Sequence, residues 1–279
     1  MVYASVLENR AVIAVSGPEA RDFLQGLITN DMGACREGQA IYAGLLTPQG
    51  KILFDFFVVA NGEKSWLIDC AGSRAGDLVK RLTLYRLRAK VDIAGRPDLA
   101  VAAMWNNGGT IAAEADAILY RDPRLRDLGF RGIGSKTVLA DATRDMAPGD
   151  YEAHRLKLGV PDSDDLPSDS VFALDAGFEE LMGVSFKKGC YVGQEVTARM
   201  KHRASARKRF LIADISGEIP FGTRLEAGAR ELGTLASAKD GHALALVRLD
   251  RLEDAQGKQV PVTAGGRQVV LRKPDWMNL

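Results

Sequence analysis

The chain has 279 residues, of which 46% are hydrophobic and 26% charged, and its formal net charge is +1 at pH 7. This composition is typical of a globular protein, and the length indicates two or three domains, because one hydrophobic core seldom serves so many residues. The near-neutral charge excludes an overall attraction to nucleic acid or membrane, so such a partner would need a local patch.

The first part of the chain alternates between strand-like and helix-like patterns. Strands are predicted at residues 3–7, 11–15, 40–46, 52–60, 65–70, 90–94 and 99–104. Helices are predicted after Pro18 and over residues 77–87, where apolar residues recur at helical spacing. Strands and helices mixed in this order favour α+β layers over a doubly wound parallel sheet.

The remaining chain changes character twice. Residues 106–136 are rich in Gly and Arg and show no clear element boundaries. A helix is predicted at residues 150–158, ended by Gly159 and Pro161. After residue 205, short strand patterns lie between glycines, as in a small β-barrel. These strands are predicted at residues 209–215, 232–236, 243–248 and 268–271.

The most informative segment is residues 188–198, KGCYVGQEVTA, which places one cysteine between two glycines and beside two lysines. The glycines permit a tight turn or a close approach to a ligand. Lys187 and Lys188 favour the thiolate form of Cys190, which is both the nucleophile and the metal ligand. The alternative is that Cys190 is a small apolar residue on a buried turn.

The other cysteines, Cys35 and Cys70, are far from Cys190, so the sequence contains neither a disulfide framework nor a self-contained zinc or cluster motif. A reducing compartment fits this pattern. The chain start has no apolar segment after a basic one, and Asp55 interrupts the longest apolar run. These features predict a cytoplasmic protein without membrane contact.

Four stretches resemble a known family. They are residues 23–31 (FLQGLITND), 45–52 (LLTPQGKI), 154–161 (HRLKLGVP) and 184–195 (VSFKKGCYVGQE). Together they resemble the YgfZ-type folate-binding proteins, a family that includes the mitochondrial iron-sulfur cluster assembly factor. That family is related to the glycine cleavage T-protein, an aminomethyltransferase. The resemblance covers the first 200 residues and is weak beyond residue 205.

The resemblance implies a T-protein-like α+β fold in which three domains form a ring. Residues 1–47 and 137–204 would form a discontinuous folate-binding-type domain, and residues 48–136 an inserted domain, both α+β and ferredoxin-like. Residues 205–279 would form a C-terminal β-barrel. The change of pattern near residue 205 agrees independently, whereas the discontinuity of the first domain comes from the resemblance alone.

The resemblance also implies a folate-binding accessory protein that assembles or repairs iron-sulfur clusters through Cys190, with Lys188 assisting. Cys190 would be one ligand of a transient cluster shared with an assembly carrier or a recipient protein, because one cysteine cannot supply four thiolates. Tetrahydrofolate or a derivative would be the cofactor. Its candidate contacts are Tyr151, Arg155, Gly189, Tyr191, Gln194 and Glu195.

Tyr151 and Arg155 lie one turn apart on a predicted helix and could face the same cavity, although an amphipathic surface helix would carry them equally well. One departure concerns Lys157, which stands where the T-protein has its pterin-binding glutamate. A cation cannot accept the pterin's N–H donors, so Lys157 weakens the alternative of a folate-dependent aminomethyltransferase.

A third hypothesis is an RNA-modification-associated protein that acts through a basic run from Arg199 to Arg209. The run could contact RNA or the polyglutamate tail of a folate, because both are polyanions. A solvated helix end is the alternative, and a Glu195–Arg199 pair would support it. The run has no aromatic residue to stack on bases, which weakens the RNA hypothesis.

Overall fold

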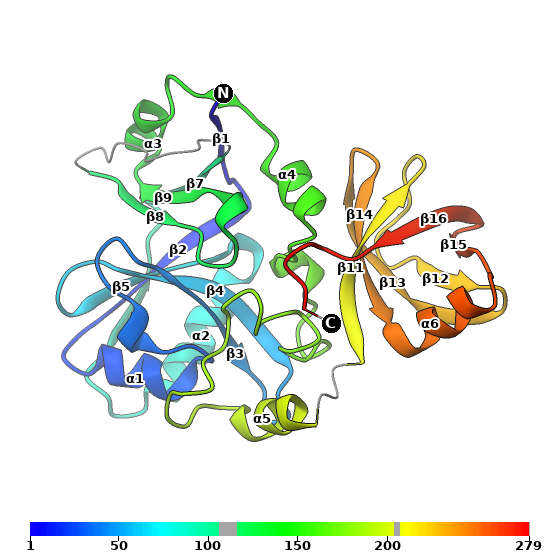
Figure 1. The fold of residues 1–279 in the computed structure, drawn as a ribbon. Coiled ribbons are helices and arrows are strands. Elements are labelled where there is room, and N and C mark those ends of the chain that lie inside the picture. The colour runs from blue at the N-terminus through cyan, green and yellow to red at the C-terminus, as the bar shows by residue number, and fades with distance from the viewer. Residues whose placement is uncertain (106–115, 204–206, 279) are drawn as a thin grey trace.

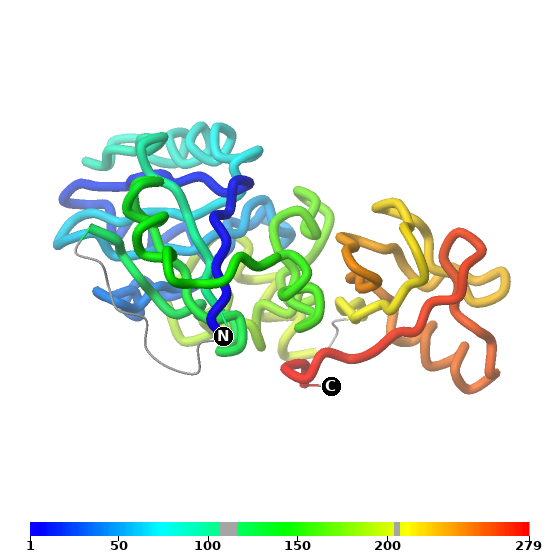
Figure 2. Tube along the Cα trace, turned by 90° about the horizontal axis from the view of Figure 1, so that it is seen from above, coloured from blue at the N-terminus to red at the C-terminus, as the bar shows by residue number. Residues whose placement is uncertain are grey.

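The computed structural model describes residues 1–105, 116–203 and 207–278. The larger part of the molecule contains two five-stranded sheets with helices around them, and a closed barrel lies beside it (Figure 1). Figure 2 shows the same division from above, with the C-terminal segment returning from the barrel to the larger part. Trp276 fastens this segment, because its indole N–H donates to the backbone oxygen of Leu158 at 2.9 Å.

The first sheet is antiparallel, with the strand order β3-β4-β5-β2-β6. Its strands are β2 (Arg10–Ser16), β3 (Ile41–Leu46), β4 (Ile52–Ala60), β5 (Ser65–Ala71) and β6 (Asp92–Gly95). Helices α1 (Ala20–Leu27) and α2 (Ala75–Arg86) share a hydrophobic core with one face of this sheet. Strand β4 is apolar on both faces, since Phe56 packs in this core and Phe57 in the next.

The second sheet has the order β10-β1-β7-β9-β8 and lies against the free face of the first. Its strands are β1 (Tyr3–Val6), β7 (Ala100–Trp105), β8 (Ile118–Arg121), β9 (Phe130–Gly134) and β10 (Ala147–Pro148). The rings of Phe57 and Tyr120 meet between the sheets, with centroids 6.3 Å apart. Helix α3 (Lys136–Ala142) packs on β7 and β9.

Helices α4 (Tyr151–Leu158) and α5 (Gln194–His202) connect the sheets to the barrel. The barrel strands close in the order β11-β14-β13-β12-β15-β16. Their bounds are β11 (Lys208–Ile215), β12 (Arg224–Ala227), β13 (Arg230–Lys239), β14 (His242–Arg248), β15 (Val262–Ala264) and β16 (Arg267–Arg272), with α6 (Leu249–Gly257) after β14. The predicted α+β fold with a C-terminal barrel is confirmed.

The sheets divide the chain differently from the predicted domain boundary at residue 47. That boundary falls in the turn between β3 and β4, which pair in one sheet with Gly44 opposite Asp55. Strand β1 instead joins β7, β8 and β9. Strands β8 and β9 were not predicted; in β9 a buried charge, Arg131, interrupts the apolar pattern, and β8 has only four residues. The predicted barrel start at residue 205 lies outside the described residues.

Candidate functional site

Cys190 lies on an exposed loop that is held by the residue two positions before it. The buried ammonium of Lys188 donates hydrogen bonds to the backbone oxygens of Gln25, Ile28 and Asn30, at 2.7, 2.7 and 2.8 Å. Burial lowers the pKa of Lys188 to about 8. Carbonyl oxygens at and beyond the end of α1 thus engage the donors of the Lys188 ammonium, and the expectation that Lys188 stabilises the Cys190 thiolate stays a prediction.

The loop is also held on its other side. The ring of Tyr191 is buried, and its centroid lies 5.2 Å from the ammonium of Lys188. Gly193 has φ +83°, and a Cβ added there would lie 2.6 Å from the backbone oxygen of Thr47. Gly189, by contrast, has open space around it and no positive φ. Close packing therefore requires the second glycine of the motif and not the first.

Three of the four stretches that carry the family resemblance meet around Cys190. Residues 184–195 contact residues 23–31 through Lys188 and through the backbone N–H of Ser185, which donates to Thr29 at 3.0 Å. They contact residues 45–52 through Gly193. The fourth stretch belongs to α4, which lies at the other end of the larger part from α5 (Figure 1).

The three thiols differ in access. Cys190 is exposed, whereas Cys35 and Cys70 are buried in the core beneath α1 and α2. Burial raises the pKa of Cys35 to about 11 and that of Cys70 to about 12. Since the thiolate is the reactive form, Cys190 is the accessible thiol among the three. In the described part of the chain, no group of three or more His, Cys, Asp or Glu residues could hold a metal ion.

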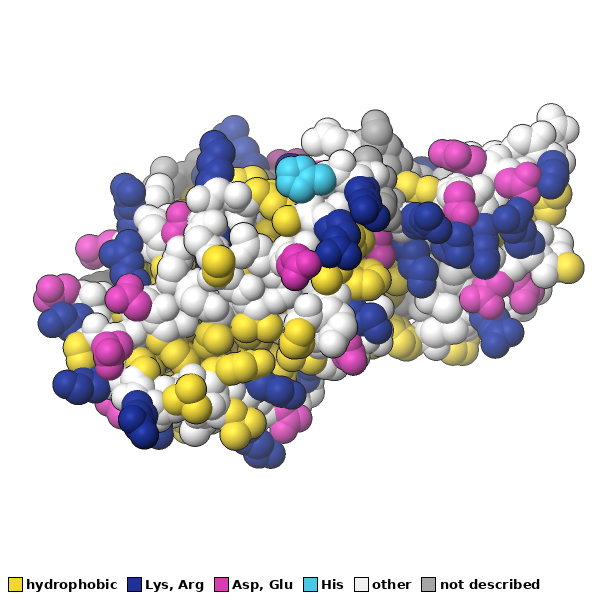
Figure 3. All heavy atoms as spheres, turned by 90° about the horizontal axis from the view of Figure 1, so that it is seen from below, with side chains coloured by type: hydrophobic (Ala, Val, Ile, Leu, Met, Phe, Trp, Pro, Cys, Tyr) yellow, Lys and Arg dark blue, Asp and Glu magenta, His cyan; other side chains and the backbone are white. Residues whose placement is uncertain are grey.

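Three of the six Lys and Arg residues in the predicted basic run form ion pairs among the described residues. Its paired cations are Arg199 with Glu195, Lys201 with Glu179, and Arg209 with Glu180. Residues 204–206 of the run lie outside the described residues. Seen from below, Lys and Arg side chains gather over the barrel and hydrophobic side chains over the larger part (Figure 3). The exposed Glu195–Arg199 pair at 2.9 Å supports the interpretation of this run as a solvated helix end.

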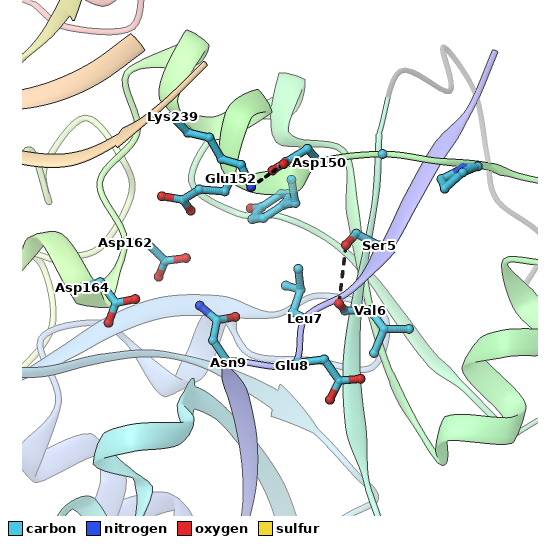
Figure 4. A pocket seen from close by; sticks show the side chains of 13 residues that line it. Ser5, Val6, Leu7, Glu8, Asn9, Asp150, Glu152, Asp162, Asp164 and Lys239 are labelled. Carbon is cyan, nitrogen blue, oxygen red and sulfur yellow. Dashed lines mark hydrogen bonds and ion pairs between the residues drawn. The ribbon is translucent and has the colours of Figure 1, made fainter. Parts of the chain in front are cut away.

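A second candidate site is a cavity of about 640 Å³ between β1, the start of α4 and the barrel. Its carboxylate residues are Glu8, Asp150, Glu152, Asp162 and Asp164. Figure 4 shows Asp162 and Asp164 on one side of the cavity and Asp150 and Glu152 on another. Lys239 at the end of β13 reaches across from the barrel and pairs with Asp150 at 2.5 Å.

The predicted folate contacts do not gather in this cavity. Tyr151 lines it, but Arg155 is turned into ion pairs with Asp165, at 2.7 Å, and Glu152. The expectation that Tyr151 and Arg155 face one cavity is therefore corrected. Lys157 is exposed. The other predicted contacts lie at or just before the start of α5 and do not line this cavity, and they are Gly189, Tyr191, Gln194 and Glu195.

The cavity residues fit the pterin end of a folate. A cavity of about 640 Å³ is within the range of small-molecule sites. Carboxylates such as Asp162 and Asp164 can accept the pterin's N–H donors, and Leu7 provides an apolar wall. Lys239, the one cation among the lining residues, is already paired, so a folate's glutamate carboxylates would remain in solvent.

Behind the cavity lies a buried ion network that the sequence analysis missed. Arg10 and Arg131 pair with Asp69 at 2.7 and 2.8 Å, and Arg124 pairs with Asp122 at 2.8 Å. Burial alone would raise the pKa of Asp69, but Arg10 and Arg131 hold it below its ordinary value. The available signal was a charge within an otherwise apolar strand, as in β5 and β9.

Two parts of this chain match the models of known protein families. Residues 7–103 match the GCVT N-terminal domain model, and residues 207–279 match the CAF17 C-terminal beta-barrel domain model. The human mitochondrial iron-sulfur cluster assembly factor IBA57 is 33% identical, over 97% of this chain and 84% of that protein. The chain belongs to the IBA57 family of iron-sulfur cluster assembly factors. The mouse member is 31% identical over the same shares.

The IBA57-family chain shares the T-protein fold, as its sequence predicted. A crystal structure of the glycine cleavage system aminomethyltransferase T from Bartonella henselae superposes with a TM-score of 0.76. The match covers 99% of this chain and 86% of that one, at 15% sequence identity. The predicted family resemblance and T-protein-like fold are therefore confirmed.

The expectation of a cytoplasmic protein is wrong. The IBA57 relatives from human, mouse and Neurospora crassa are all named mitochondrial. Scattered cysteines indicate a reducing compartment but do not tell one such compartment from another. In the part of the chain that the structure describes, no helix is both long and apolar enough to cross a bilayer.

Proposed function

We propose that this protein acts in iron-sulfur cluster assembly and that Cys190 donates one thiolate to a cluster shared with a partner protein. The observation that carries the proposal is the contrast between the exposed Cys190 and the buried Cys35 and Cys70. Membership of the IBA57 family supports the cluster assembly role. The fixed loop supports the role of Cys190, because a ligand held in place loses little freedom on binding.

The chemistry at Cys190 is ligand exchange. The thiol would give its proton to the departing ligand, a thiolate of the donor protein, and the Cys190 thiolate would take the coordination position on the iron that this ligand leaves. The other positions belong to thiolates of the partner, which is either an assembly carrier or a recipient protein. Because this protein would hold the cluster through one thiolate, only the bond between the Cys190 sulfur and iron has to break for the cluster to pass to another protein. The complex would therefore be reversible.

A direct test replaces Cys190 with Ser in cells and measures the activity of cluster-dependent enzymes. We expect activity to fall to the level seen without the protein, because serine is a poor ligand for cluster iron. Cys35→Ser, checked for folding, is the matched control and should leave activity near normal. Undiminished activity in Cys190→Ser would overturn the proposal.

The cavity supports a second part of the hypothesis, which is that a reduced folate binds through its pterin ring. The exposed Asp164 has no hydrogen bond or ion pair within the described residues, so its carboxylate is available to a ligand. Calorimetric titration with tetrahydrofolate should show binding that Asp164→Lys weakens by about 10-fold or more. The surface control Asp77→Lys on α2 should bind as the wild type does. No heat of binding to the wild type would contradict this part.

Two alternatives remain predictions with their own readouts. A folate-dependent transferase would release an aminomethyl group from a carrier protein in the presence of tetrahydrofolate. Lys157 is exposed and is not among the residues that line the cavity, so its charge does not decide whether a pterin binds there. RNA binding would be salt-dependent and would be lost when Arg207, Lys208 and Arg209 are neutralised.

A further inference from the structure

We infer that Lys188 is a positioning residue that clamps the Cys190 loop to the C-terminal end of α1. This inference rests on the proposed function of Cys190 and assigns Lys188 a mechanical role in it. The motif order Lys-Gly-Cys-Tyr then has a structural reason, because Lys188 and Tyr191 are buried anchors and the two residues between them are exposed.

The clamp is chemically complete. Backbone oxygens at the end of a helix lack partners within the helix and carry partial negative charge. The ammonium of Lys188 meets Gln25 in the last turn of α1, Ile28 at its C-cap and Asn30 just beyond. The three contacts are 2.7–2.8 Å long, within the range of charge-assisted hydrogen bonds. A buried cation is therefore satisfied without any carboxylate partner in hydrogen-bond contact.

The clamp limits how far the sulfur can move. Cys190 is two residues from one anchor and one residue from the other, and neighbouring Cα atoms are about 3.8 Å apart. Without Lys188, the nearest contact on that side is Phe186, whose ring centroid lies 4.4 Å from the ammonium of Lys201. Tyr191 still keeps the Cα of Cys190 about 3.8 Å from its own Cα. The sulfur would therefore stay near Tyr191 but point in more directions, and fewer of these would suit a shared cluster.

The competing role for Lys188 is activation of the thiol by its charge. The two roles make different predictions. An activator alters the pH at which Cys190 becomes reactive, whereas a clamp alters the motion of the loop and leaves that pH unchanged. The contacts favour the clamp, because they direct the ammonium to three carbonyl oxygens.

The test compares Lys188→Met with Lys187→Met, which removes the same charge from the exposed neighbouring lysine. Hydrogen exchange is measured on the full chain at Ser185, Lys187 and Gln194, whose backbone N–H groups donate hydrogen bonds on either side of Cys190, and in the barrel. We expect exchange in the loop to rise about 10-fold or more in Lys188→Met, with the barrel unchanged, and no rise in Lys187→Met. Unchanged loop exchange in Lys188→Met would overturn the inference.

Alkylation of Cys190 by iodoacetamide as a function of pH supplies the second readout. The midpoint pH should be the same in wild type, Lys188→Met and Lys187→Met. A midpoint that rises only in Lys188→Met would show an activating role and would also overturn the inference. If Lys188→Met raises exchange in the barrel as well, the comparison is repeated with Lys188→Gln, which keeps an N–H donor on a shorter side chain.

Hydrogen exchange and the alkylation midpoint do not involve a cluster. They can therefore contradict the clamp while Cys190 is still required for cluster assembly, or support the clamp while Cys190 is not required. If Cys190→Ser abolishes cluster assembly in cells, the same assay on Lys188→Met should show a loss of at least about half the activity. Lys187→Met should retain full activity. Full activity in Lys188→Met, with a loosened loop, would show that assembly does not depend on the clamp and would overturn the inference.

Discussion

The Cys190 loop and the ion network between the sheets both bury positive charge, but they satisfy it in opposite ways. In the network, three arginines pair with three carboxylates, so the charges balance; they are Arg10, Arg124 and Arg131 with Asp69, Asp122 and Asp162. In the loop, Lys188 donates its hydrogen bonds to backbone oxygens and not to a carboxylate. In the proposed arrangement, the charged Lys188 therefore anchors the loop, while the neighbouring Cys190 is the exposed group.

Buried carboxyl groups show the same dependence on partners. Two arginines hold the pKa of Asp69 below its ordinary value in spite of burial. Asp175 is also buried, and the one hydrogen bond that its carboxyl group accepts from a described residue is long, 3.4 Å, from the backbone N–H of Lys208. Burial therefore raises the pKa of Asp175 to about 6. Burial alone therefore does not set the charge of a carboxyl group, because the neighbouring cations and hydrogen-bond donors also shift its pKa.

The largest effect should come from breaking the network. Arg131→Met leaves Asp69 buried with one of its two cations missing, and we expect a loss of about 3–5 kcal/mol in the free energy of unfolding. Urea denaturation measures it as a lower midpoint at constant slope. Lys80→Met, which breaks an exposed pair with Asp77 on α2, should leave the midpoint unchanged. Equal midpoints for both variants would refute the structural role of the network.

The next largest effect should be the difference in alkylation rate between Cys190 and the two buried cysteines. In the folded protein at pH 8, iodoacetamide should modify Cys190 at least about 100-fold faster than Cys35 or Cys70, since a thiol of pKa 11 is about one part in a thousand thiolate there. Mass spectrometry of the peptides gives each rate. In denaturant the three rates should converge. Equal rates in the folded state would remove the basis for singling out Cys190.

The two glycines of the motif sharpen the description of the loop. Gly193→Ala places a Cβ 2.6 Å from the backbone oxygen of Thr47 at a positive φ, and should destabilise the protein by about 1–3 kcal/mol. Gly189→Ala meets no atom within 4 Å and should be neutral. Thermal unfolding of the pair tests this. A larger destabilisation by Gly189→Ala than by Gly193→Ala would contradict the described packing of the loop.

The smallest effect concerns Asp175 and depends on pH. Its folded pKa is raised to about 6, so the stability that it contributes is complete below about pH 4 and is lost as the pH rises through 6. Asp175→Asn keeps the hydrogen bond and removes the charge. We expect the variant to exceed the wild type by about 1–3 kcal/mol at pH 7.5 and to match it near pH 4. The exposed Asp77→Asn should show no such trend, and parallel curves for Asp175→Asn would refute the raised pKa.

Local patterns predicted much of the fold. Helices α1, α2 and α4 and most strands were found because their apolar residues recur at the period of one secondary structure. Strands β8, β9, β10, β12 and β15 and helices α3 and α6 were missed. Strand β9 carries the buried Arg131, and β12 is a strand of four residues, so neither shows a clear apolar period. The order of the strands in the sheets could not be predicted from local patterns, because β1 pairs with β7, about a hundred residues further along the chain.

By itself the sequence predicted the α+β class and the barrel, because these depend on residue types and their spacing along the chain. The resemblance of four stretches predicted the family, and the motif around Cys190 made that residue the candidate thiol. Only the tertiary structure decided what Lys188, Arg155 and Gly193 do. Their partners are Gln25, Asp165 and Thr47, which come from other segments. The role of a charged residue or a glycine depends on the atoms that it contacts in the folded protein. These atoms belong to segments distant in sequence, so the local sequence does not predict the contact.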